Sequence, residues 1–176
     1  LRLAKVQDDI DSGGLEKSRK DQILEGKLQT TIEGVTFTGR FDRLDILDSG
    51  AVLLDYKSGS SSTYAKSLQL PAYALAMRGK GFPPLLGWSY LCLGDGKVSG
   101  RFTEPASQFF GKNKVSLETL DSLIKEAGTK LEAMAKGLLS GNFKPNWDSD
   151  ACKTCVYRGL CRKDERPGGS GDETDQ

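Results

Sequence analysis

One pair of expected strands, joined by a turn, constrains the fold of this chain most strongly. Val52-Leu53-Leu54 is an apolar run with a β-branched residue, which is typical of a short buried strand. The range 36–47 mixes Thr, Phe, Leu and Ile and is also predicted to be a strand. Asp48-Ser49-Gly50 between them has the composition of a turn. The sequence therefore predicts an antiparallel pair that sets Asp42 beside Asp55.

Charged residues stand at the end of this strand pair. Side chains two apart on a strand share a face, so Asp55 and Lys57 project together, whereas Tyr56 offers its backbone carbonyl. Carboxylate oxygens are the ligands that Mg²⁺ prefers, and a metal held in this way can activate water and neutralise a phosphate. Two close carboxylates repel each other unless Lys57 and a divalent ion compensate them. A solvated strand end with surface charges is the alternative.

A helix is expected over residues 62–78, because apolar residues recur there at spacings of three and four. Gln69 and Tyr73 are four apart and share one face of this helix. Pro71 removes a backbone donor, so it either kinks the helix or marks its first turn. Ordinary helix packing is the alternative explanation for Gln69 and Tyr73.

The remaining pattern alternates between strands and helices. The expected elements are a helix, a break and a short helix in 1–25, a strand over 85–93, a hairpin turn at 94–96, a returning strand over 97–103, and a loop over 104–114. A long helix begins after Ser116, with an apolar core-facing stripe of Leu117, Leu120, Ile124, Ala127, Leu131, Met134 and Leu138. Residues 166–176 are predicted to be a disordered tail. This order indicates an α/β sandwich around a mixed sheet.

Three of the four cysteines form a second cluster, Cys152, Cys155 and Cys161. Thiolates at such spacing can converge on one metal ion or cluster. The chain has no histidine, so a fourth ligand would be a cysteine, a carboxylate or a group outside the chain. Structural zinc is one alternative, and a disulfide, which suits an oxidising compartment, is another. Cys92 lies in an apolar run and is expected to be a buried thiol.

Composition leaves nucleic-acid binding open. Twenty-five basic and 24 acidic residues give a net charge of +1, so DNA contacts would come from a local, salt-sensitive patch. The 176 residues suffice for one core. No apolar run reaches the roughly 18 residues of a membrane span, and the first residues lack a signal-peptide pattern. The opening Leu1, without an initiator Met, suggests a fragment of a longer protein.

Taken in order, these motifs resemble the PD-(D/E)XK nuclease superfamily, in its RecB/AddB-like branch. The resemblance rests on Gly39-x-x-Asp42-Arg43-x-Asp45, Asp55-Tyr56-Lys57-Ser58-Gly59 and Gln69-x-x-x-Tyr73, with Phe41 in place of the family's proline. It implies a restriction-endonuclease-like core, in which helices flank a mixed β-sheet. It also implies a single nuclease domain over 1–165, with the catalytic core at 25–103, a long helix at 116–141 and the cysteine motif at 152–162.

The resemblance implies catalytic roles for Asp42, Asp55, Lys57, Gln69 and Tyr73. Asp42, Asp55 and the carbonyl of Tyr56 would bind Mg²⁺ or Mn²⁺, and Lys57 would orient or help deprotonate the attacking water. Gln69 and Tyr73 would help position Lys57 and the DNA backbone. Glu25 would match an acidic residue one strand earlier. The branch carries an upstream histidine, which is either outside this chain or lost.

The run Gly141-x-Phe143-x-Pro145, followed by the cysteines, resembles the C-terminal end of iron–sulfur nucleases of this branch. It implies that Cys152, Cys155 and Cys161 bind a [4Fe–4S] cluster whose fourth ligand lies outside this chain. The implied function is a metal-dependent DNA exonuclease domain of a repair and recombination helicase–nuclease. Its partners would be DNA and helicase domains or subunits, at the cytoplasmic nucleoid. The alternatives are an inactive nuclease-fold module for DNA binding or complex assembly, and a zinc-stabilised interaction domain without nuclease ancestry.

Overall fold

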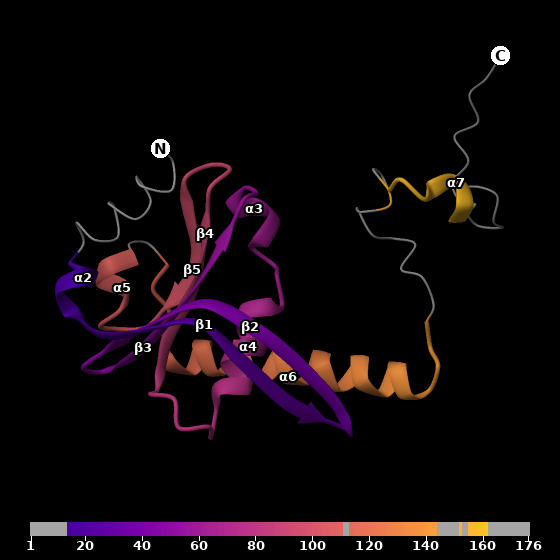
Figure 1. Cartoon of the computed structure of the whole chain (residues 1–176), viewed down its shortest axis with the longest axis horizontal. Helices are drawn as coiled ribbons and strands as arrows, with labels where there is room; N and C mark the ends of the chain where they lie inside the picture. The colour runs from indigo at the N-terminus through magenta and orange to yellow at the C-terminus, as the bar shows by residue number, and fades with distance from the viewer. Residues whose placement is uncertain (1–13, 111–112, 144–151, 153–154, 162–176) are drawn as a thin grey trace, which may run out of the picture. The chain divides into compact units, whose positions relative to one another are not determined.

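The computed structural model describes residues 14–110, 113–143, 152 and 155–161. These residues fall into two compact units, Leu1–Leu139 and Ser140–Gln176. The first unit contains a five-stranded sheet and its helices (Figure 1). The described part of the second unit includes one short helix, α7 (Arg158–Cys161). No helix in the described ranges is long and apolar enough to span a membrane.

The sheet has the strand order β1-β2-β3-β4-β5 and is mixed. Only β3 and β4 pair in parallel, and the other neighbours are antiparallel. The strands are β1 (Arg19–Ile32), β2 (Val35–Leu47), β3 (Gly50–Lys57), β4 (Leu85–Cys92) and β5 (Lys97–Phe102). The parallel pair requires a crossover, and two helices between β3 and β4 supply it. The expected α/β fold with a mixed sheet is confirmed.

The hairpin expected around residues 48–50 is present. β2 and β3 pair from Leu47 opposite Gly50 to Arg43 opposite Leu54. The residues of β2 that precede Arg43 pair with β1 and not with β3. In this part β1 and β2 form a long two-stranded ribbon that extends away from β3 (Figure 1). The prediction from the apolar run of β3 was therefore sufficient to fix this part of the sheet.

The N-terminal expectation is wrong from Arg19 onward. A short helix, α2 (Leu15–Ser18), is followed at once by the 14-residue edge strand β1. Most of β1 is polar and part-exposed, with only Leu28 buried, so its sequence lacks the apolar alternation of a half-buried strand. Its strand form depends on pairing with β2 along almost its whole length.

The helix expected over 62–78 is divided in two. A single turn, α3 (Ser61–Tyr64), is followed by a short connection and then by α4 (Gln69–Met77). Pro71 is the third residue of α4, in the first turn, where its missing N–H is not needed for an intrahelical bond.

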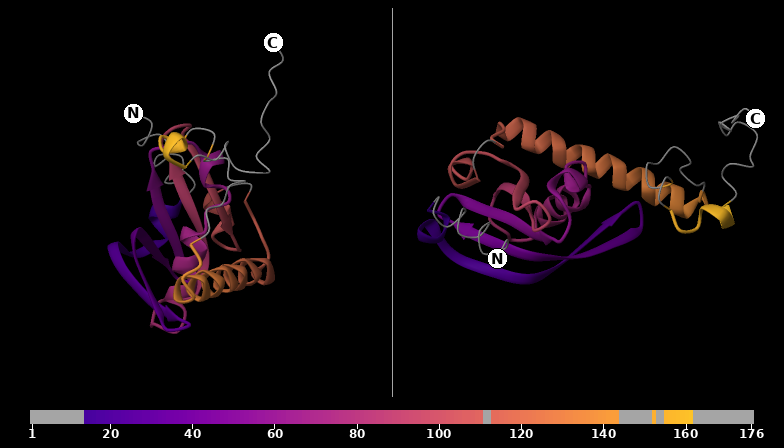
Figure 2. Two further views of the ribbon diagram at one scale, coloured as in Figure 1. Left: turned by 90° about the vertical axis from the view of Figure 1, so that its right-hand side faces the viewer. Right: turned by 90° about the horizontal axis from the view of Figure 1, so that it is seen from above.

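Two hydrophobic clusters cover the two faces of the sheet. On one face, α4 and the long helix α6 (Leu117–Leu139) lie side by side (Figure 2). They pack over residues that include Leu44, Leu53 and Trp88. The other face is covered by α2 and by α5 (Ser107–Phe110), which pack on residues such as Leu54 and Phe102.

Two expectations about these helices need correction. The expected loop at 104–114 contains α5, whose Phe109 and Phe110 are buried in the second cluster. Ser116 caps α6 as predicted, because its Oγ accepts a hydrogen bond from the Thr119 backbone N–H at 3.1 Å. Only part of the predicted stripe is buried, however. Leu120, Ile124, Ala127 and Leu131 are buried with Ala135, whereas Leu117, Met134 and Leu138 are at least half exposed.

Candidate active site

The β2–β3 register brings the two predicted carboxylates together. Arg43 lies opposite Leu54, and the next pair in the same register is Asp42 with Asp55. Side chains of directly opposite residues in an antiparallel pair share one face and lie close together. The Oδ2 atom of Asp42 also accepts a hydrogen bond from the Tyr56 backbone N–H at 2.8 Å. The carboxylate of Asp42 is therefore fixed against β3 at the point where β2–β3 pairing ends.

Asp55 is nearly inaccessible to solvent, with 2% exposure. Its Oδ2 pairs with Lys57 Nζ at 2.5 Å, and Gln69 Nε2 donates to its Oδ1 at 3.3 Å. No donor among the described residues meets Oδ2 with hydrogen-bond geometry. Burial raises the pKa of the Asp55 carboxyl, and the charge of Asp42 adds to this shift while Lys57 opposes it. The site thus holds a buried carboxylate whose negative charge is incompletely compensated.

Lys57 lies between this carboxylate and an aromatic wall. Its Nζ is 5.7 Å from the ring centroid of Tyr64 and 5.6 Å from that of Tyr90, within the range of cation–π attraction. Burial alone would lower the pKa of Lys57, but the interaction with Asp55 outweighs it and the pKa is raised. Lys57 is consequently an ammonium group at neutral pH.

Gln69 and Tyr73, both on α4, join the site from above the sheet. Gln69 Nε2 lies 3.3 Å from Asp55 Oδ1 and 3.2 Å from the Tyr73 hydroxyl, so it links the two side chains. Tyr73 packs on the backbone of Gly39, where an added Cβ would lie only 2.4 Å from a ring carbon. Gly39 therefore allows α4 to approach β2 closely enough for this contact.

The donor set on β2 and β3 fits a hard divalent cation. The Lys57 carbonyl accepts from the Leu93 backbone N–H at 2.8 Å on the β4 side. Strand alternation consequently turns the Tyr56 carbonyl toward β2, where Asp42 lies. Two carboxylates and this carbonyl supply oxygen ligands of the kind that Mg²⁺ and Mn²⁺ take. A cation would share Oδ2 of Asp55 with Lys57 and would reduce the repulsion between the two carboxylates. In the described part of the chain, no cluster of three or more His, Cys, Asp or Glu residues is placed to hold a metal.

A buried ionic network lies on the opposite face of the same strands, and sequence reasoning assigned it no role. Arg43 donates from Nε and Nη2 to the two oxygens of Asp45, at 2.8 and 2.6 Å, and from Nη1 to the Tyr56 hydroxyl at 3.1 Å. Gln22 Nε2 donates to Asp45 Oδ1 at 3.0 Å. Burial opposes the charge of Arg43, but the hydrogen bonds to Asp45 and Tyr56 prevail and raise its pKa. The network therefore anchors the side chain of Tyr56, whose backbone contacts Asp42.

A sequence signal for this network was present. Arg43 and Asp45 are two charged residues of one strand face, two apart and flanked by Leu44 and Ile46. Charged residues inside an apolar strand are expected to pair with each other.

Glu25 does not join the carboxylate pair. Its neighbours Leu24 and Gly26 pair with Arg43 and Phe41, so Glu25 lies opposite Asp42 in the β1–β2 register, with its backbone in the left-handed region at φ 55°. Its carboxylate is exposed and forms an ion pair with Arg40 Nε at 3.0 Å.

The cysteines occupy two different environments. Cys92 is buried in β4, and burial raises the pKa of its thiol to about 11. Cys152, Cys155 and Cys161, in the second unit, are partly or fully exposed, and all four cysteines are thiols. The described residues do not bring these three into a metal-binding group, so the geometry does not itself offer a cluster site. Residues 166–176, the predicted tail, lie outside the described residues.

Comparisons with known proteins identify the family. The family model of the PD-(D/E)XK nuclease superfamily matches residues 6–162. Among solved structures, the crystal structure of SSO0001 is similar with 13% sequence identity and a TM-score of 0.40, over 87% of this chain and 66% of that one. A search of curated proteins found no match. The two carboxylates, the lysine and the mixed sheet described above lie within the matched range, and the chain belongs to the PD-(D/E)XK nuclease superfamily.

Proposed function

We propose that this chain is a metal-dependent DNA exonuclease domain of the RecB/AddB-like branch. It would act in DNA repair and recombination, with helicase domains or subunits as partners, at the cytoplasmic nucleoid. The observation that carries the proposal is the meeting of Asp42, Asp55 and Lys57 at one edge of the β2–β3 pair. The chain spans 66% of the solved chain it resembles, so partners and polarity are part of the proposal.

The residues of the site divide the chemistry between them. Asp42, Asp55 and the Tyr56 carbonyl would hold Mg²⁺ or Mn²⁺. A bound cation would lower the pKa of a water molecule and neutralise charge on the scissile phosphate. Because Lys57 is protonated, its ammonium group donates to the attacking water or to a phosphate oxygen and stabilises developing negative charge. It does not act as the base in this protonation state.

Gln69 and Tyr73 serve as positioning residues. Gln69 fixes one oxygen of Asp55, which leaves the other oxygen for Lys57 and the cation. Tyr73 in turn restrains the amide of Gln69. This chain of contacts couples the first turn of α4 to the geometry of the carboxylate pair.

Cleavage of linear single-stranded and duplex DNA with Mn²⁺ tests the proposal. Asp55→Ala and Lys57→Ala should each reduce the rate by about 10²–10³-fold, as expected for loss of charge stabilisation in the transition state. Asp48→Ala and Lys80→Ala remove the same charges at exposed positions and should leave the rate unchanged. Equal cleavage by all four variants and by the unmodified protein would show that this site is not catalytic.

A second candidate is an inactive nuclease-fold module that binds DNA or assembles a complex. The resemblance implies an upstream histidine and this sequence has none, so the second candidate applies if that ligand is lost rather than outside this chain. Calorimetric titration with Mn²⁺ separates the two candidates, because the inactive module would bind no metal at millimolar concentration. The remaining alternative, a zinc-stabilised domain without nuclease ancestry, is wrong because the family model matches.

The iron–sulfur cluster stays a prediction, and no step of the proposed reaction depends on it. Cys152, Cys155 and Cys161 supply three thiols, and a [4Fe–4S] cluster takes four ligands. Anaerobic purification with iron and sulfide analysis tests this prediction. Zinc at unit stoichiometry, with no iron, would assign the thiols to a structural zinc site.

A further inference from the structure

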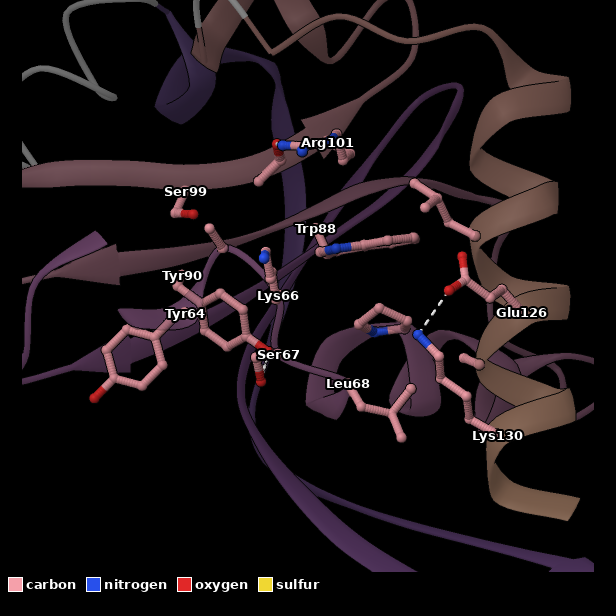
Figure 3. Close-up of a pocket in the computed structure, with 15 residues that line it drawn as sticks. Tyr64, Lys66, Ser67, Leu68, Trp88, Tyr90, Ser99, Arg101, Glu126 and Lys130 are labelled. Atoms are coloured by element: carbon pink, nitrogen blue, oxygen red, sulfur yellow. Dashed lines mark hydrogen bonds and ion pairs between the residues drawn. The ribbon is translucent and has the colours of Figure 1, made fainter. Parts of the chain in front are cut away.

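A pocket of about 340 Å³ lies on the α4–α6 face of the sheet (Figure 3). Two of its lining residues, Tyr64 and Tyr90, also contact Lys57 of the proposed active site. Its floor is formed by β4 and β5, where Trp88 pairs with Arg101 and Tyr90 pairs with Ser99. The connection between α3 and α4 forms one wall and α6 forms another. The volume is within the range of small-molecule sites.

The pocket carries an excess of positive charge. Lys66 and Arg101 are exposed, and in the described part of the chain neither forms an ion pair. Arg101 Nη1 donates to the neighbouring Gly100 carbonyl at 2.7 Å, which leaves its remaining donors for a ligand. Lys130 is neutralised by Glu126 at 2.6 Å (Figure 3). Two uncompensated cations therefore face this pocket.

The pocket also has a rigid aromatic lining. Trp88 is 4% exposed and extends from β4 toward α6 (Figure 3). Tyr90 donates its hydroxyl to Ser67 Oγ at 2.9 Å and accepts from the Leu70 backbone N–H at 3.1 Å. Tyr64 packs on Tyr90 with ring centroids 5.5 Å apart. Aromatic surfaces that are fixed in this way lose little entropy when a planar ligand packs on them.

The aromatic lining connects the pocket to the active site. Tyr64 and Tyr90 face Lys57 and also line the pocket. Asp55 pairs with Tyr90, and Tyr90 pairs with Ser99, so these three residues form one row across the sheet. Two strand spacings separate the ends of this row by about 10 Å. A DNA strand with its scissile phosphate at Asp55 would therefore pass beside the pocket.

We propose that this pocket binds one unpaired nucleotide of the DNA strand held at the active site. Lys66 and Arg101 contact its phosphate, and its base packs against Tyr64 and lies beside Trp88, whose ring is almost wholly buried. The inference rests on the proposed nuclease function and adds a subsite to it. Basic and aromatic side chains together are the combination that binds single-stranded nucleic acid without sequence readout. A base stacked in a duplex does not enter a pocket of this kind unless it is first unpaired and extruded.

Binding measured without cleavage tests the subsite separately from catalysis. The full chain carrying Asp55→Ala is titrated with a labelled oligothymidylate and with a blunt duplex, and anisotropy is followed. Lys66→Ala with Arg101→Ala should weaken oligothymidylate binding by about tenfold. It should also reduce the slope of log K against log salt by about 0.7, since one phosphate of a single strand is then no longer neutralised. The matched control is Lys80→Ala with Lys125→Ala, which removes two exposed charges outside the pocket lining and should change binding less than twofold.

A second readout reports on the base. The chain has two tryptophans, so Trp147→Phe leaves Trp88 as the only one. Oligothymidylate should quench Trp88 emission, whereas an abasic strand of equal length should not.

The subsite is refuted if the pocket variant binds like the control, if neither form binds DNA, or if the duplex binds as tightly and quenches Trp88 equally. Strand binding that depends on the pocket, in a protein that never cleaves DNA, would support the subsite and overturn the nuclease proposal. Cleavage that is lost in the Asp55 and Lys57 variants but unchanged in the Lys66 and Arg101 variant would support the nuclease proposal and overturn the subsite.

Discussion

Replacing Asp45 with Asn should destabilise the protein strongly, although the two side chains have nearly the same shape. Asp45 is fully buried and both of its oxygens accept hydrogen bonds, one from Gln22 Nε2 and Arg43 Nε and the other from Arg43 Nη2. In either orientation, the amide of Asn places an NH₂ group against one of these donors. The substitution therefore replaces an accepting oxygen by a donor and removes the negative charge that pairs with Arg43 and, at 3.8 Å, with Arg19.

The magnitude follows from what happens to Arg43. Its side chain is 5% exposed, and a guanidinium keeps its proton even when buried, so Arg43 cannot escape the loss of its partner by giving up a proton. Leaving one member of a buried ion pair without its partner costs about 3–5 kcal/mol. That is a large part of the roughly 5–15 kcal/mol by which a domain of this kind is stable. Glu104→Gln breaks the exposed pair with Lys114 and should cost only about 0–1 kcal/mol.

Urea denaturation followed by circular dichroism measures both free energies of unfolding. A third variant combines Arg43→Met with Asp45→Leu, which removes both charges, and it should recover most of the loss, because apolar replacement of a buried pair is often neutral. The reasoning fails if Asp45→Asn costs no more than Glu104→Gln, or if the double variant is less stable than Asp45→Asn. Either result would mean that Arg43 reaches solvent or finds other acceptors.

Three further outcomes are expected. Gly39→Ala should cost about 1–3 kcal/mol of stability, because the new Cβ would lie 2.4 Å from a ring carbon of Tyr73. It should also slow cleavage, because Tyr73 restrains Gln69 at the site. An unchanged melting temperature and an unchanged rate would contradict this prediction. Burial raises the pKa of Asp55, so the stability that this group gives the metal-free protein falls as the pH rises through that pKa. Because Mn²⁺ binds the ionised carboxylate, it should raise the melting temperature more in neutral than in mildly acidic buffer. An equal rise in both buffers would contradict the assignment of Asp55 as a metal ligand. Cys92, whose pKa is about 11, should react with a disulfide reagent only on unfolding, whereas Cys155 should react in the native protein; quantification of modified peptides decides this.

The sequence was sufficient to predict the β2–β3 hairpin and its carboxylates because the local signals agree there. The apolar run of β3 fixes the strand, and the turn at 48–50 fixes the register, so Asp42 must come opposite Asp55. The position of Gln69 also followed from local rules, since Pro71 is tolerated in the first turn of a helix. The hydrogen bond from Gln69 to Asp55 was not among the predictions, which linked Gln69 to Lys57 and the DNA backbone through the resemblance alone.

The elements that the sequence did not predict depend on partners far along the chain. β1 is a strand because β2 pairs with it, and its own residues carry little strand pattern. α5 forms a single turn, and its two phenylalanines pack on the second hydrophobic cluster. Such short elements are stabilised by tertiary burial rather than by propensity, and periodicity over a few residues cannot reveal them.

The site and its support occupy opposite faces of the same two strands, and this arrangement explains why β2 carries so many charges. Asp42 and Asp55 share one face, whereas Arg43 and Asp45 pair on the other face, where Arg43 also donates to the Tyr56 hydroxyl. The backbone of Tyr56 donates to Asp42 on one side, and its hydroxyl accepts from Arg43 on the other. A change at Arg43 would therefore disturb Tyr56, which stands between Asp55 and Lys57 in β3, without touching either of those two residues. The buried ion pair, which stabilises little compared with apolar packing, is thus explained by the precision it gives to the carboxylates above it.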